Sequence, residues 1–136
     1  MAEKKINWTL NVNIPGGPSI SASSPLIIEA YDMIEVEIKK GTTRVQTGSG
    51  DKSLVNLVLI KTDVSDGSLL TYHFIDDPDH PPTPAPHEYI LDTPLHLFMG
   101  KGCVGVLESV KNIIFTNDLT NPVNVQILVG RDATPA

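Results

Sequence analysis

"LVNLVLIKT" (residues 54–62) carries the strongest structural signal in the chain, because alternate positions are apolar on both faces. One face holds Leu54, Asn56, Val58 and Ile60, and the other holds Val55, Leu57 and Leu59. A strand that is apolar on both faces is central in a β-sandwich or is sealed by another subunit. Its β-branched residues, together with the turn residues that follow, favour a strand over a helix. We therefore predict a central strand here.

Residues 6–14 alternate strictly. The apolar face holds Ile6, Trp8, Leu10, Val12 and Ile14, and the uncharged polar face holds Asn7, Thr9, Asn11 and Asn13. This alternation predicts a strand with one buried face. A solvent-facing strand usually carries Lys or Glu, so the uncharged polar face is compatible with subunit contact and equally with ordinary exposure. "PGGP" (residues 15–18) ends the strand, since proline cannot donate to a ladder.

Similar patterns predict strands on both sides of this central segment. Residues 33–39, 69–75 and 123–129 alternate, residues 113–117 read as another strand, and residues 43–47 read as a polar edge strand. "VSDGS" (residues 64–68) predicts a hairpin, since Asp66-Gly67 suits positive φ. About nine or ten short strands, with turns every ~8–12 residues, predict an all-β, antiparallel, jelly-roll-like β-sandwich. We expect residues 1–136 to form a single domain, ending in a polar C-terminal tail at residues 130–136.

The charge balance excludes several classes of partner. The formal net charge is −6, and Lys and Arg form no stripe, which argues against nucleic acid and anionic membranes. No apolar run reaches ~18 residues, so no membrane span is expected. Cys103 is the only cysteine, and residues 1–10 lack the apolar region of a secretion signal. These features predict a cytoplasmic protein, or part of a particle released without a signal peptide.

A proline-rich excursion at residues 76–88 separates two predicted strands. Its prolines favour extended structure and oppose regular pairing, which predicts a stiff exposed arm that contacts a neighbouring subunit. The interface candidates are therefore Pro78, Pro81, Pro82, Pro84, Pro86 and Tyr89, with Asn7, Thr9, Asn11 and Asn13 from the first strand.

The same region holds the best cluster of ionisable groups: His73, His80, His87 and His96, with Asp76, Asp77 and Asp79. They are weak candidates for a metal site, because the spacing contains no His-x-His, no His-Glu-x-x-His and no EF-hand pattern. Solvated loop side chains are the competing interpretation. We predict no metal, no cofactor and no catalytic residue. The histidines would act, if at all, by making a subunit contact sensitive to mild acid.

Three classes of function compete for such a chain. The leading prediction is a non-enzymatic structural protein that self-associates into a homo-oligomer or a larger shell or decoration-type assembly. In strand count and pattern alone, the chain is similar to jelly-roll subunits of virus or phage type. A glycan- or ligand-binding module is the alternative, although the exposed aromatic residues that it needs are scarce. A metal-dependent β-barrel enzyme ranks third, because ligand-spaced histidines on strands are missing.

Overall fold

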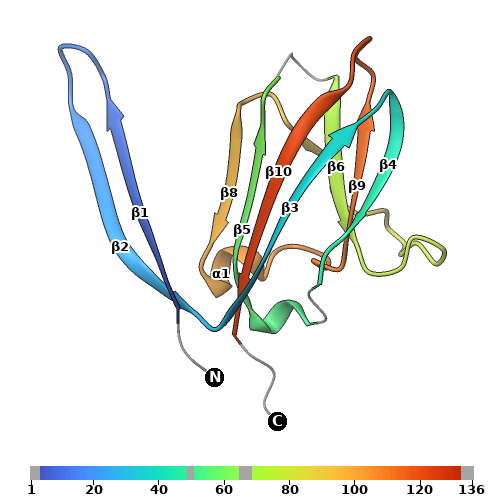
Figure 1. The fold of residues 1–136 in the computed structure, drawn as a ribbon, viewed down its shortest axis with the longest axis horizontal. Helices are drawn as coiled ribbons and strands as arrows, with labels where there is room; N and C mark the ends of the chain where they lie inside the picture. The colour runs from blue at the N-terminus through green and yellow to red at the C-terminus, as the bar shows by residue number, and fades with distance from the viewer. Residues whose placement is uncertain (1–3, 49–50, 65–68, 133–136) are drawn as a thin grey trace.

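The computed structural model describes residues 4–48, 51–64 and 69–132, and its secondary structure is almost entirely β (Figure 1). In chain order the strands are β1 (Lys4–Asn13), β2 (Ser19–Ile28), β3 (Ala30–Ile38), β4 (Gly41–Gln46), β5 (Val55–Thr62), β6 (Leu70–Ile75), β7 (Tyr89–Ile90), β8 (Leu95–Met99), β9 (Asn112–Asn117) and β10 (Val123–Arg131). Two short helices, η1 (Lys52–Leu54) and α1 (Lys101–Val104), lie between strands. The prediction of an antiparallel all-β sandwich is confirmed.

The body consists of two four-stranded antiparallel sheets. The front sheet has the order β3-β10-β5-β8, and the back sheet has the order β4-β9-β6-β7. The predicted central strand is β5, which pairs with β10 on one side and β8 on the other. The predicted polar edge strand is β4, at the end of the back sheet.

The hairpin predicted at residues 64–68 is wrong, because the strands flanking it, β5 and β6, lie in different sheets. Residues 65–68 themselves lie outside the described residues. The reason is that β10 and β8 occupy both edges of β5, so β6 pairs with β9 and β7 instead. A local turn signal reports a reversal of the chain and does not report which sheet the next strand joins.

The core lies between the two sheets, where alternate side chains of both point inward. Val58, Ile60, Val125 and Ile127 come from the front sheet and Tyr72, Phe74, Ile113 and Phe115 from the back sheet, and all are at most 1 % exposed. Burying one such side chain contributes about 1.5–3 kcal/mol relative to leaving it in water. The period-2 pattern of the sequence therefore identifies this core correctly.

Among the strands that the structure describes, β1 and β2 pair only with each other, in register from Lys4↔Ile28 to Asn13↔Ser19. This hairpin, which we call the arm (residues 4–28), projects from the body (Figure 1). "PGGP" forms its tip, where Gly16 has a φ of 74°. The predicted strand is thus confirmed, whereas its predicted buried face is wrong: Leu10 and Val12 are 48 % and 47 % exposed. Alternation reveals an amphipathic strand but cannot reveal whether a second layer covers it.

The polar tail predicted at residues 130–136 begins too early. Strand β10 continues through Gly130 and Arg131, with a bulge between them. Arg131 forms an ion pair with Asp32, and the amide of Asp132 donates to the carbonyl of Leu54 at 2.9 Å. Polar residues are held here because they pair with neighbouring strands. The rest of the predicted tail, residues 133–136, lies outside the described residues.

Candidate functional site

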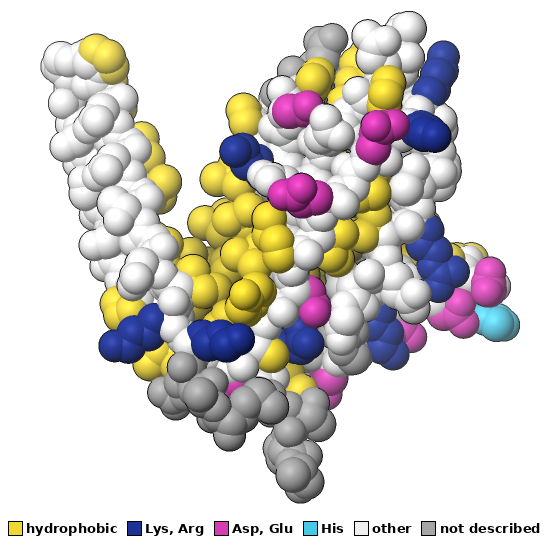
Figure 2. Space-filling model, in the orientation of Figure 1, with side chains coloured by type: hydrophobic (Ala, Val, Ile, Leu, Met, Phe, Trp, Pro, Cys, Tyr) yellow, Lys and Arg dark blue, Asp and Glu magenta, His cyan; other side chains and the backbone are white. Residues whose placement is uncertain are grey.

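The apolar face of the arm, which we call the arm face, is built by facing positions of β1 and β2. Its apolar residues are Ile6, Trp8, Leu10 and Val12 from β1 and Ile20, Ala22, Leu26 and Ile28 from β2, and the same face carries Ser24 opposite Trp8 and Lys4 opposite Ile28 at the base. Val12 lies directly opposite Ile20, which is 67 % exposed. Residues 6–28 contain no charged side chain. Figure 2 shows apolar side chains along the side of the arm that is turned toward the body.

The opposite face of the arm carries the polar interface candidates of the first strand. Asn7, Thr9, Asn11 and Asn13 are all exposed, and their cross-strand partners are Pro25, Ser23, Ser21 and Ser19. These side chains, which are polar apart from Pro25, alternate with the arm face, so they point away from the body. Ile27, opposite Lys5 on the same side, is an exposed apolar exception.

The outer face of the front sheet, which we call the sheet face, is also apolar. A row of Met33, Leu128, Leu59 and Leu97 crosses β3, β10, β5 and β8. Met33 and Leu97, at the two edges, are 51 % and 40 % exposed. Figure 2 shows this apolar surface across the gap from the arm.

At one end, polar and charged groups border the sheet face. The neighbouring row contains Glu35, Gln126 and Lys61, and the amide of Gln126 donates to Glu35 at 2.9 Å. Leu95, 47 % exposed, continues the apolar surface into this row on β8. At the opposite end Tyr31 is 50 % exposed beside Gly130.

The arm face and the sheet face meet at a fixed joint. Ile28, the last residue of the arm face, is 1 % exposed and packs over Gly130. A Cβ placed on Gly130 would lie only 3.2 Å from Cγ2 of Ile28 and 3.4 Å from Cβ of Leu57, so only glycine leaves room here without displacement. The amide of Glu29 donates to the carbonyl of Arg131 at 3.0 Å. From this joint the two apolar faces diverge.

The proline-rich excursion runs between β6 and β7 without regular secondary structure and extends from the lower part of the body (Figure 1). Pro81, Pro82 and Pro84 are exposed, whereas Pro78 and Pro86 are half-buried. Tyr89 is less available than the sequence suggests. It is half-buried, and its ring stacks on Tyr72 with centroids 5.3 Å apart.

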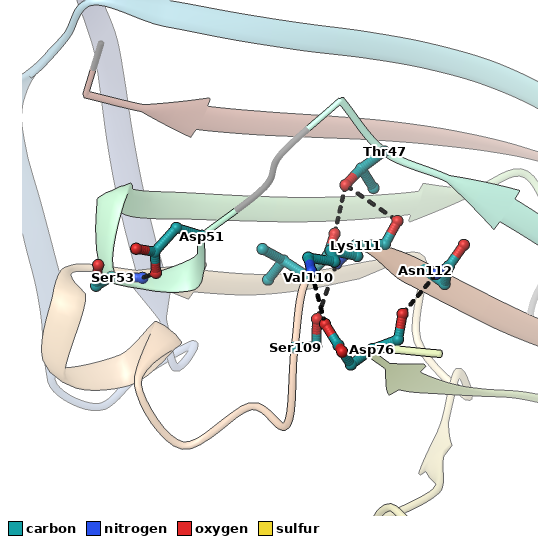
Figure 3. A network of polar contacts seen from close by, with 8 residues as sticks. All are labelled: Thr47, Asp51, Ser53, Asp76, Ser109, Val110, Lys111 and Asn112. Carbon is teal, nitrogen blue, oxygen red and sulfur yellow. Dashed lines mark hydrogen bonds and ion pairs between the residues drawn. The ribbon is translucent and has the colours of Figure 1, made fainter. Parts of the chain in front are cut away.

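Polar contacts hold the start of this excursion against the body. The side-chain amide of Asn112 donates to the carbonyl of Asp76 at 3.0 Å, and Lys111 forms an ion pair with the Asp76 carboxylate at 3.0 Å. Figure 3 shows these residues beside Thr47, whose hydroxyl donates to the carbonyl of Val110. The excursion is therefore anchored at its base, while its central prolines are exposed.

The four histidines do not converge. His73 points outward from the back sheet, His80 is 84 % exposed and pairs with Asp77 at 2.7 Å, and His87 packs on Tyr89. Hydrogen bonds from the His80 ring and the Asp79 amide lower the pKa of Asp77. Within residues 4–48, 51–64 and 69–132, no group of three or more His, Cys, Asp or Glu side chains could hold a metal ion.

His96 differs from the other histidines because it faces the core. Its Nδ1 lies 2.6 Å from the hydroxyl of Tyr72. Burial lowers the pKa of His96, against a smaller opposite effect of Asp92, and burial also raises the pKa of Tyr72. The pair is thus two neutral groups in one hydrogen bond, which fixes β8 to β6 across the sandwich.

Most of the aromatic rings are also part of the core. Tyr72, Phe74 and Phe98 pack with Tyr89 and Phe115 at centroid distances of 5.3–6.0 Å. These rings interlock the two sheets and are therefore not a platform for a sugar. The half-buried Trp8 lies on the arm face, and the exposed Tyr31 lies at one end of the sheet face.

The sequence contains one signal for this apolar pair of faces. Residues 54–62 are apolar on both sides, which indicates either a central strand of a sandwich or a strand sealed by another subunit. The inner side of β5, with Val58 and Ile60, lies in the core between the sheets. The outer side, with Leu57 and Leu59, belongs to the sheet face. The arm face escapes detection because its alternation resembles that of an ordinary core strand.

Among the described residues, no helix has the length and the apolar content needed to span a bilayer. Comparison with protein-family models, with curated proteins and with solved structures found no match to the chain.

Proposed function

We propose that the protein is a non-enzymatic structural subunit that self-associates into a homo-oligomer, alone or within a larger shell or decoration-type assembly. The observation that carries this proposal is the pair of exposed apolar surfaces, the arm face and the sheet face, on one chain. Large contiguous apolar patches on a soluble protein mark interaction sites, because water contact with them is unfavourable.

The size of these surfaces supports a stable interface. Eight large apolar side chains are 40–67 % exposed: Leu10, Val12, Ile14, Ile20, Tyr31, Met33, Leu95 and Leu97. At that exposure they leave on the order of 800 Å² of surface, which is close to what one partner contributes to a standard-size interface. A two-stranded hairpin alone is marginally stable in water, so a covering layer would also stabilise the arm.

The topology of the body is compatible with assembly. Consecutive strands from β3 to β10 cross between the sheets, except from β6 to β7, and the orders are β3-β10-β5-β8 and β4-β9-β6-β7. This order supports a jelly roll, a fold that capsid subunits and lectins share. We favour the assembly role over glycan binding because the exposed surface here is mainly aliphatic.

Size-exclusion chromatography with light scattering tests the proposal. We expect a mass that is a multiple of 14.7 kDa at micromolar concentration. Replacing Leu97→Lys should reduce that mass, whereas Asn124→Lys, exposed on the same sheet beyond the apolar rows, should leave it unchanged. A mass of 14.7 kDa for the unmodified chain at every concentration would contradict self-association.

The proline-rich excursion is a second proposed contact. Pro81, Pro82 and Pro84 are exposed and conformationally restricted, so docking them costs little entropy. A chain lacking residues 78–86 should associate more weakly than the full chain and unfold at the same denaturant concentration. Loss of folding would instead show that the excursion supports the core.

A further inference from the structure

We propose that the arm of one copy lies across the front sheet of a second copy, with the arm face against the sheet face. This inference rests on the proposed self-association and specifies which surfaces meet. One copy contributes its arm face to the interface, and the other copy contributes the outer side of β3, β10, β5 and β8.

The two faces match in chemistry. The arm has no charged side chain between residues 6 and 28, and the row from Met33 to Leu97 is also uncharged. The charged groups of the outer front sheet begin at the next row, with Glu35 and Lys61. Apolar side chains can therefore meet apolar side chains without burying an unpaired charge, which would be costly.

One contact of this kind already exists within each chain. Ile28 belongs to the arm face and is buried on the sheet face against Gly130 and Leu57. Exposure then rises along the arm: Leu26 is half-buried, and Ile20, near the tip, is 67 % exposed. Within the described residues, burial of the arm face is therefore greatest at the joint and lowest near the tip.

Contacts at the joint hold the arm apart from its own sheet. Glu29 is the single residue between β2 and β3, and its amide is bonded to Arg131. Ile28 fills the space over Gly130, and Nζ of Lys4 lies 4.9 Å from the centroid of the Tyr31 ring. Closing the arm would break these contacts. A second copy offers the same apolar surface without that cost.

The dimensions also agree. The 10 residues of β1 span about 33 Å, and the 8 residues of β5 span about 26 Å, so one arm covers the length of the sheet. The arm would then form a third layer about 10 Å above the front sheet. Two copies can exchange arms reciprocally, or each arm can reach the next copy in a closed ring.

Cysteine cross-linking between differently tagged chains tests this pairing. Cys103 is exposed and is first replaced by Cys103→Ser. One chain then carries Leu10→Cys in the arm face, and the other carries Leu97→Cys in the sheet face. The two full-length chains are refolded together and treated with a bismaleimide that spans about 10 Å, the distance between packed sheets. A Thr9→Cys chain, modified on the polar face of the arm, replaces the arm variant as the matched control.

We expect the product joining Leu10→Cys to Leu97→Cys to exceed the two same-site products, and to exceed the product from Thr9→Cys. An oligomer that gives mainly arm-to-arm product, or no product, overturns the pairing but leaves self-association intact. Cross-linking within one chain of a Leu10→Cys/Leu97→Cys double variant overturns it in favour of closure on its own sheet. A monomer at all concentrations overturns both proposals.

Discussion

Replacing two apolar side chains near the tip of the arm with alanine should weaken association strongly and leave the stability of the folded body nearly unchanged. Val12 and Ile20 face each other across the hairpin and are 47 % and 67 % exposed. Full burial of such a side chain is worth about 1.5–3 kcal/mol, so covering the exposed half contributes ~1 kcal/mol at each position. Changing both to alanine removes ~2 kcal/mol from each arm contact. A dimer with two exchanged arms would lose ~4 kcal/mol, or roughly a 1,000-fold change in Kd.

Sedimentation over a dilution series measures this Kd. The matched control is Asn11→Ala with Ser21→Ala, because these residues also face each other but lie on the polar side of the same hairpin. We expect the control to keep the Kd of the unmodified chain. Urea unfolding at a concentration where all variants are monomeric should give nearly equal stabilities, since none of the four residues belongs to the core between the sheets.

Two outcomes would refute the reasoning. A Kd unchanged by Val12→Ala/Ile20→Ala would mean that the tip of the arm face is not buried in the assembly. An equal loss in the Asn11→Ala/Ser21→Ala control would mean that hairpin formation, and not apolar contact, determines association.

Three further predictions concern stability. Asn117→Ala removes a fully buried side chain whose amide nitrogen donates to two backbone carbonyls and whose oxygen accepts from one backbone amide. We expect the free energy of unfolding, measured by chemical denaturation, to fall by about 3 kcal/mol. Gly130→Val should cost about 1–3 kcal/mol because its methyl groups collide with Ile28, whereas Gly102→Val, where a Cβ meets nothing within 4 Å, should be tolerated in a thermal melt. Burial lowers the pKa of His96 in the folded protein, so on acidification this imidazole is protonated in the unfolded chain at a higher pH than in the folded one. The free energy of unfolding therefore falls as the pH drops below about 6.5. Urea unfolding at pH 7.5 and 5.5 should show a smaller loss for His96→Asn, and an identical loss would contradict this assignment.

The sequence predicts the strands well because alternation is a direct consequence of pleating. Side chains of successive residues point to opposite faces, so the two-residue spacing of Val58 and Ile60 is enough to place them on one face. It predicts pairing less well. The Asp-Gly turn after β5 indicates a hairpin, yet β5 and β6 lie in different sheets because strand order depends on contacts between distant segments.

The candidate site is predictable in part. Contact with another subunit is one of two explanations for the uncharged first strand and for the two-faced apolar central strand alike. The sequence places Tyr89 on an exposed surface, whereas its ring stacks on Tyr72. It also assigns Leu10 and Val12 to a core, although both are about half exposed. This error cannot be avoided from periodicity, because an apolar face has the same pattern whether its own chain covers it or not.

The amino-acid sequence by itself determined that this chain forms short antiparallel strands with apolar inner faces, since local side-chain alternation sets which residues share a face. Only the tertiary structure decided that residues 4–28 leave the body as an arm and that the outer side of β5 belongs to an exposed apolar surface. The physical reason is that burial is a property of long-range packing. Ile28 is buried and Ile20 is exposed on the same face of one strand because Gly130 lies beneath only the first of them.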